Sequence, residues 1–292
     1  MADLASARTH LETALRLYDS DSTPRRGKQV LYVQDQKSTG LCYLALTTTL
    51  MGDVDSGLSA ARRGLAHSEA LGGAHTINFS LCYLAAVLYI QGEFAEADKR
   101  ATQSMHSARE QGFATWIGIS QTIRGGAQVA NGDGAAGLDE LMRGTTAHAG
   151  LEAVAYQPFS MGLLATGLIA AGRLDEAFDA LTRGLTVSET TGERFYASEL
   201  WRLKGTVQAA RRDVAEAERC FREAIAIARR QQARLFELRS TVSLCGVLEG
   251  TDRAVAVREI LRPVLDGFSE GATARDVLAA RQVIVDAKVA DR

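Results

Sequence analysis

Two short strings in this sequence match motifs that bind phosphate groups in other proteins. Gly132-Asp-Gly-Ala-Ala-Gly137 matches the GxGxxG pattern, which binds a pyrophosphate only when it follows a strand within a βαβ unit. Arg25-Arg-Gly-Lys28 matches the end of a phosphate-binding loop, but Ser22 stands where that loop requires its first glycine. No strand is expected before Gly132, so neither string predicts a nucleotide site.

Histidine, cysteine and serine residues show no spacing that is typical of catalysis. The histidines form no HExxH pair, no two cysteines form a CxxC pair, and no serine lies in a GxSxG turn. We expect the histidines to face solvent and the cysteines to be small, reduced, buried residues. The sequence therefore predicts no catalytic residue, no metal and no cofactor. The residues concerned are His10, His67, His75, His106, His148, Cys42, Cys82, Cys220 and Cys245.

The overall composition excludes several further classes of function. Among 292 residues, 33 Lys and Arg oppose 35 Asp and Glu, so the chain lacks the basic excess with which nucleic-acid-binding proteins neutralise phosphates. The most apolar run, 159–172, is shorter than the ~20 residues that a membrane-spanning helix needs. The N-terminus lacks the basic and apolar regions of a signal peptide. These features predict a cytoplasmic protein that contacts neither nucleic acid nor membrane.

An internal repeat organises the chain. Gly52, Gly92, Gly132 and Gly172 are 40 residues apart, and Arg212 and Asp252 continue the same series. Apolar residues recur at helical spacing before and after each of these positions, and small residues recur seven positions before and five after. A glycine between two helices tolerates the positive φ of a tight turn. Each 40-residue unit is therefore predicted to be a pair of helices.

Helix pairs of this kind cannot bury their apolar faces alone, so neighbouring pairs must stack. The prediction is an all-α, right-handed α-solenoid of about six units with a period of about 40 residues. We expect a partial N-terminal repeat in 1–38, complete repeats in 39–270 and a capping helix in 271–292. The polar segment 19–28 contains Pro24 and is predicted to be a surface loop.

The repeat columns resemble those of the tetratricopeptide (TPR) family. Trp201 and Gly205 are followed by Ala217, Phe221 and Ala224, in the order of that family's pattern, although the TPR period is about 34 residues. The segments 191–205, 215–232, 235–240 and 260–264 resemble one group more closely. That group is the C-terminal TPR arm of bacterial multidomain regulators that contain a STAND-type ATPase and an adenylate cyclase or LuxR-type DNA-binding domain.

This resemblance implies a non-catalytic interaction or scaffold module of a bacterial signalling protein. In such regulators the chemistry belongs to other domains, so any cyclase or ATPase activity would lie outside this chain. The partner would be a protein or peptide, including the ATPase or cyclase domain of a parent protein. The alternative function is a sensor arm that binds a peptide or a small ligand, as the corresponding region does in maltose-type transcriptional activators.

First helices should line the inner, ligand-facing side of a TPR-like solenoid. Two interpretations of the aromatic candidates carry equal weight, because such rings either anchor a peptide or pack against neighbouring helices. Arg124 and Lys204 fall in an otherwise apolar column, where their heads either reach water or meet a carboxylate ligand. The full set of candidate binding residues is Phe79, Tyr83, Gln121, Arg124, Phe159, Glu199, Arg202 and Lys204.

The N-terminal segment resembles the second helix of a unit whose first helix is missing. Ala7, Leu11 and Ala14 occupy the columns that Ala217 and its neighbours occupy later in the chain. An unpaired end of a solenoid exposes an apolar face. We therefore expect this end to be covered by a partner, and a homo-oligomer is one way to cover it.

Overall fold

The computed structural model describes residues 3–20, 34–150, 155–251 and 253–290. All regular secondary structure in these ranges is helical, as the repeat predicts. The segment 21–33, which includes most of the predicted surface loop, lies outside the described residues. In chain order the helices are α1 (Leu4–Ser20), α2 (Gln36–Met51), α3 (Val54–Leu71), α4 (Ala74–Gln91), α5 (Phe94–Gln111), α6 (Ala114–Ala130), α7 (Gly134–Ala149), α8 (Gln157–Ala170), α9 (Leu174–Thr191), α10 (Ala197–Ala210), α11 (Val214–Gln231), α12 (Arg234–Val247), α13 (Ala254–Asp266) and α14 (Arg275–Ala290).

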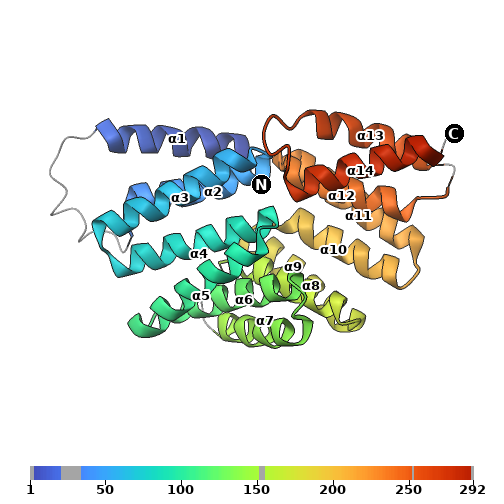
Figure 1. The fold of residues 1–292 in the computed structure, drawn as a ribbon. Helices are drawn as coiled ribbons and strands as arrows, with labels where there is room; N and C mark the ends of the chain where they lie inside the picture. Colours follow the sequence, from blue (N-terminus) through green and yellow to red (C-terminus); the bar gives the residue numbers. More distant parts are fainter. Residues whose placement is uncertain (1–2, 21–33, 151–154, 252, 291–292) are drawn as a thin grey trace. The chain divides into compact units, whose positions relative to one another are not determined.

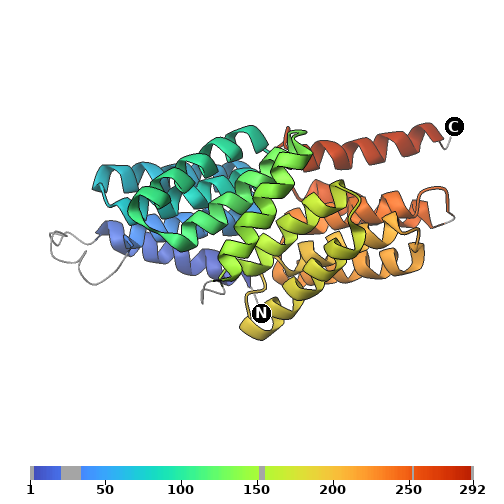
Figure 2. The ribbon, with the colours of Figure 1, turned by 90° about the horizontal axis from the view of Figure 1, so that it is seen from below.

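The chain divides into two compact units. The N-terminal unit comprises Leu4–Thr49 and Val54–Ala153, and the C-terminal unit comprises Val154–Arg292 with two short segments, Met1–Asp3 and Leu50–Asp53. Within each unit, helices that follow one another in the sequence pack side by side (Figure 1). The pairs run from α2–α3 to α12–α13, and Figure 2 shows the antiparallel pairing from below. The fold is therefore an all-α, TPR-like solenoid of consecutive helix pairs.

Two-residue turns join the helices of a pair. In the α4–α5 turn, Gly92 has φ 83° and its N–H bonds to the carbonyl oxygens of Leu88 and Tyr89. Gly52, Gly132 and Gly172 also have positive φ, which confirms the turn role of the repeated glycines. Arg212 takes the same place with φ 65°, a conformation that costs roughly 1–2 kcal/mol in a residue with a Cβ atom. The geometry of the turn therefore persists where its glycine is lost.

First and second helices of each pair are buried in different ways. The second helix α5 buries one stripe, Ala97, Ala101, Ser104, Met105 and Ala108, as an amphipathic surface helix does. The first helix α4 has the same 18 residues in length but is buried around most of its circumference. A helix that is apolar on all sides lies inside the protein. The first helices therefore form the interior of each unit, and the second helices form the exterior.

Small residues set the distance between the helices of a pair. A Cβ atom added to Gly125 in α6 would lie only 2.6 Å from the backbone nitrogen of Leu141 in α7. A Cβ atom added to Gly205 in α10 would meet the ring of Phe221 in α11 at 2.6 Å. Real Cβ contacts are not this short, so the glycines permit a close approach of the two helices. The predicted small-residue columns thus have a packing reason.

Candidate functional site

The phosphate-binding string of α6 and α7 is a helix turn. Gly132 has φ 104°, α7 begins at Gly134, and Gly137 lies against α6. Arg25 and its neighbours fall outside the described residues. Among the residues that the structure describes, no three His, Cys, Asp or Glu side chains gather in a way that could hold a metal ion. Within the same residues, no helix is both long and apolar enough to cross a membrane.

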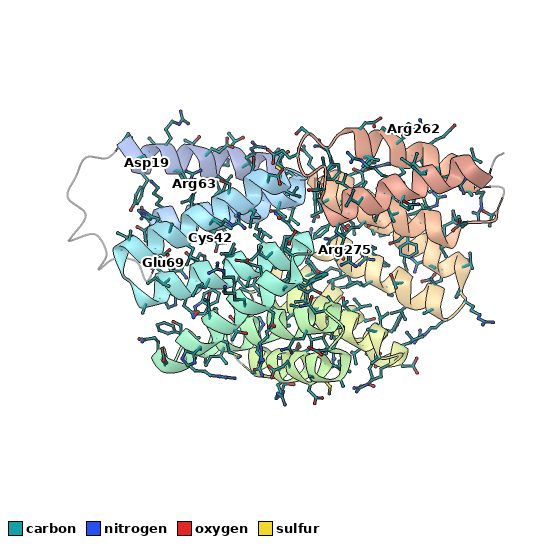
Figure 3. The ribbon with its side chains drawn as sticks, in the orientation of Figure 1. Asp19, Cys42, Arg63, Glu69, Arg262 and Arg275 are labelled. Carbon is teal, nitrogen blue, oxygen red and sulfur yellow. The ribbon has the colours of Figure 1, made fainter. Side chains whose placement is uncertain are left out.

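All four cysteines are buried as thiols. Burial raises the pKa of Cys42 and of Cys82 to about 12, so neither forms a nucleophilic thiolate near neutral pH. In Figure 3, Cys42 lies among packed helices, whereas Arg63 and Glu69 project from α3. The prediction that the histidines face solvent is wrong for His148, which is 1% exposed. His148 fits beside α6 because Gly118 presents only backbone to it.

A row of aromatic side chains occupies the first helices of the N-terminal unit. The ring of Phe79 lies 4.5 Å from Tyr83 and 5.4 Å from Trp116, between ring centroids. Tyr43 contacts the edges of both Phe79 and Tyr83. Phe79 and Tyr83 are almost wholly buried, whereas Tyr43 is 41% exposed. Phe79 and Tyr83 thus pack in the core, and their contact with a partner stays a prediction.

A histidine closes this aromatic row at one end. The indole N–H of Trp116 donates a hydrogen bond to Nε2 of His75 over 3.2 Å, and Phe113 packs edge-on against the same imidazole. Burial lowers the pKa of His75. A neutral imidazole can accept this bond, whereas a protonated one cannot. The row therefore combines apolar contact with one defined hydrogen bond.

The polar candidates of α6 lie on two different sides of the helix. Gln121 is 7% exposed. The guanidinium of Arg124 lies 3.5 Å from Asp98 of α5 and 3.5 Å from Glu140 of α7. Both acids belong to second helices, so Arg124 extends toward the exterior of the unit. A role of Gln121 or Arg124 in ligand binding stays a prediction.

The C-terminal unit has an aromatic group of its own around Phe159. Phe159 is 2% exposed, and its ring lies 5.0 Å from Tyr196, which contacts Phe236 at 5.5 Å. These rings come from α8, α12 and the N-terminal end of α10. Phe159 thus has neighbours from the following repeats, and its contact with a partner stays a prediction.

Beyond these rings, a charged network connects three first helices. Glu199 of α10 accepts two hydrogen bonds from Arg202, of 2.9 and 2.7 Å. Arg239 of α12 lies 3.8 Å from Glu199 and donates a hydrogen bond of 2.8 Å to Asp276 of α14. The Glu199 side chain is 5% exposed and that of Arg239 is 16% exposed. Two positive and two negative groups thus meet where little water reaches them.

The network holds its groups in their charged forms. Burial alone would raise the pKa of Glu199, but Arg202 and Arg239 outweigh burial and hold that pKa below its ordinary 4.5. Burial would lower the pKa of Arg239, but Asp276 and Glu199 outweigh burial and raise it. Buried charges are stable only when such partners compensate the lost hydration. The four side chains therefore depend on one another, and we call Glu199, Arg202, Arg239 and Asp276 the charged network.

Lys204 lies away from the charged network. Its ammonium lies 4.8 Å from the ring centroid of Phe178 in α9 and 5.0 Å from that of Trp201 in α10. Arg211 stacks over Phe178 and Arg219 over Trp201. Such cation–aromatic contacts hold a long side chain along an apolar surface while its charge remains near water. A ligand role of Lys204 stays a prediction.

Some members of these groups were outside the predicted set. Arg239 lies 40 residues after Glu199, so the repeat itself could have indicated it. Asp276 does not share that column, because position 279 does. Its place is visible only when α14 packs beside α12. Tyr43 and Trp116 carried the general signal of an aromatic on a first helix, but nothing in the sequence distinguished them.

Comparison with known sequences yields limited information. No family model matches the chain. An uncharacterized protein of Rhizobium meliloti (strain 1021) is 25% identical over 237 residues, which cover 80% of this chain. The same match covers only 23% of that protein. The chain therefore spans about a quarter of the length of the curated relative that it matches.

Comparison with solved structures concerns the fold. A Rap protein complexed with Competence and Sporulation Factor superposes with a TM-score of 0.62 at 10% identity, covering 99% of this chain and 87% of that one. The apo form of RapI gives 0.58 at 12% identity, over 89% of each chain. BtubC (BKLC) from P. vanneervenii gives 0.52 at 13% identity, over 76% of this chain and 93% of that one. The chain is thus a TPR-like helical repeat protein whose fold resembles that of the Rap proteins.

Proposed function

We propose that this chain is a non-catalytic binding module of a larger bacterial signalling protein, and that its ligand is a peptide. Its place is the cytoplasm, since its four cysteines are free thiols. The relative from Rhizobium meliloti is far longer than the matched region, which agrees with an arm of a multidomain regulator. A Rap protein with the same fold holds a peptide factor. Both observations support the proposal.

The charged network is the observation that carries the proposal. The column that holds Glu199 and Arg239 is filled by apolar residues in earlier repeats, namely Phe79, Ile119 and Phe159. An apolar residue would stabilise the fold at no desolvation cost, whereas buried ion pairs contribute little net stability. Perturbed, buried charges therefore mark functional positions more often than structural ones. We assign the peptide site to this part of the C-terminal unit.

The chemistry of the network indicates which group of a peptide it binds. The guanidinium groups of Arg202 and Arg239 already hold carboxylates. Arginine recognises carboxylates through paired N–H donors. A peptide's carboxylate can take the place of Asp276 on Arg239 without leaving the arginine uncompensated. The predicted ligand is therefore a peptide with a free C-terminal or acidic side-chain carboxylate.

Binding of a peptide library tests this function. Short peptides with free C-termini and the same peptides with amidated C-termini would be compared by isothermal titration calorimetry. We expect the free acids to bind at least tenfold more tightly, since one charge-assisted hydrogen bond contributes about 1.5–3 kcal/mol. Arg239→Gln should remove that preference. Arg219→Gln is the matched control, because Arg219 pairs with Glu216 on the exposed side of α11.

Two results would contradict the proposal. Arg239→Gln could leave the preference for free acids unchanged although circular dichroism shows a folded variant. Alternatively, no peptide of the library could bind, while small carboxylic acids raise the melting temperature. That second result would favour the small-ligand sensor instead.

A further inference from the structure

The two outermost helices of the described chain each leave one contact face open. Inside every complete pair, the same repeat positions of the first helix contact the second helix. Gly118 and Gly125 of α6 approach the backbone of α7, and Gly205 of α10 approaches Phe221 of α11. These positions define two columns of the first helices. The columns are Ser38, Asn78, Gly118, Pro158, Ser198 and Leu238, and Ala45, Ala85, Gly125, Ala165, Gly205 and Cys245.

All twelve residues of these two columns are buried. Leu278 and Val285 of α14 stand 40 residues after Leu238 and Cys245, so they continue the columns. Yet Leu278 is 50% exposed and Val285 is 52% exposed. Val277 and Ala280 of the same helix are fully buried. Helix α14 therefore stacks within the C-terminal unit as a first helix, while the side that meets a second helix stays open.

The opposite situation holds at α1, which has the pattern of a second helix. Ala7, Leu11 and Ala14 occupy the places of Ala217, Phe221 and Ala224. In all six later second helices these columns are buried without exception, from Gly57, Ala61 and Gly64 in α3 to Val257, Leu261 and Val264 in α13. In α1, Ala14 is exposed and the other two are only partly buried. Helix α1 therefore lacks a first helix against its core face.

We propose that α14 of one copy of this chain packs against α1 of a second copy, and that the two helices together form one further helix pair. The open columns are complementary, because α14 presents the positions that receive a second helix and α1 presents the positions that receive a first helix. A second copy supplies both missing partners at once. This inference does not depend on the proposed peptide site.

The α12–α13 pair shows that side chains of this size fit such a contact. Leu238 and Cys245 of α12 belong to one buried cluster with Val257, Leu261 and Val264 of α13. In the proposed pair, Leu278 and Val285 meet Ala7, Leu11 and Ala14, which are smaller than their counterparts in α13. The contact joins different surfaces of the two copies, so it is head-to-tail and leads to a ring or to a growing chain.

Light scattering on the 292-residue chain, after size-exclusion chromatography at increasing concentration, tests the contact. We expect the mass to rise with concentration for the unaltered chain. Leu11→Glu and Val285→Glu should each remain monomeric, because a buried, unpaired carboxylate is strongly unfavourable. An equimolar mixture of the two variants should form dimers and nothing larger, since each variant keeps one intact face and the two intact faces are complementary.

Matched controls separate this contact from general surface effects. Leu17→Glu changes an exposed leucine of α1, and Val255→Glu changes an exposed valine of α13, in a column that is exposed in every second helix. Both should associate like the unaltered chain, with unchanged circular dichroism. A chain that is monomeric throughout, association that survives Leu11→Glu, or a variant mixture that stays monomeric would each overturn the proposal. Association that survives only Leu11→Glu would indicate a symmetric contact between two α14 helices.

Discussion

The two units place different chemistry at the same repeat positions. In the N-terminal unit the inner column holds Phe79, whose ring packs with Tyr83 and Trp116. In the C-terminal unit the same column holds Glu199 and Arg239, which need each other and Asp276. The backbone pattern of paired helices is shared by both. The repeat therefore determines where a side chain lies, and each residue determines what that place can do.

This difference has an energetic consequence. The aromatic row gains stability from burial, about 1.5–3 kcal/mol for a large apolar side chain. The charged network must first lose its hydration, and the gain from pairing roughly offsets that loss. Removing one residue should therefore act differently in the two units. A ring leaves a cavity, whereas a charge leaves an uncompensated partner.

The largest effect is expected for Phe79→Ala. Phe79 is 2% exposed and has three aromatic neighbours, so the cavity should lower the free energy of unfolding by about 3–5 kcal/mol. Chemical denaturation followed by circular dichroism measures this loss. Tyr43→Ala is the matched control in the same row, and its cost should be smaller because Tyr43 is 41% exposed. Equal losses for the two variants would contradict the core position of Phe79.

A smaller loss, about 3 kcal/mol, is expected for Glu199→Ala, since it leaves Arg202 and Arg239 with too little negative charge. The double variant Glu199→Leu, Arg202→Leu should lose less than Glu199→Ala, because it removes a neutral pair and leaves Arg239 with Asp276. Denaturation of both variants and of Arg202→Leu completes the cycle. Additive losses would show that Glu199 and Arg202 do not depend on each other.

The same comparison has a pH dependence. The pKa of Glu199 is lowered in the folded protein, so its contribution to stability is present above the unfolded value of about 4.5 and is lost as the pH falls through the folded value. The difference between Glu199→Ala and the unaltered chain should therefore shrink in acid. A difference that stays constant from neutral pH down to acid denaturation would contradict this assignment.

The smallest effect is expected at Glu193, in the loop before α10. Burial raises the pKa of Glu193 to about 6, although its carboxylate accepts a hydrogen bond from the backbone N–H of Tyr156. A carboxyl with a raised pKa contributes stability below the unfolded value of 4.5 and loses it as the pH rises through 6. Glu193→Gln should thus raise the stability at pH 7 by about 1 kcal/mol, allowing for solvent screening.

The measurement for Glu193→Gln is the melting temperature at neutral pH and in acid. The gain should vanish below the unfolded pKa, because both side chains are then neutral. Glu189→Gln is a suitable control, since Glu189 is an exposed residue at the end of α9. A variant that is less stable than the unaltered chain at pH 7 would indicate that the hydrogen bond to Tyr156 needs the full charge of Glu193.

Much of the fold could be predicted because its signal is local and repeated. The turn glycines recur every 40 residues, and their positive φ values follow from the need to reverse the chain in two residues. The helical periodicity on either side needs no information from distant residues. The prediction for the histidines failed at His148, because the space beside it comes from Gly118 on another helix.

For the candidate site, the sequence by itself determined which residues share a column of the first helices. It did not determine their surroundings. Only the tertiary structure decided that Arg124 extends toward Asp98 and Glu140, that Lys204 lies between two rings, and that Asp276 completes the charged network. The physical reason is that a column follows from the helical period, whereas a pairing depends on the distance between helices that are far apart in the chain.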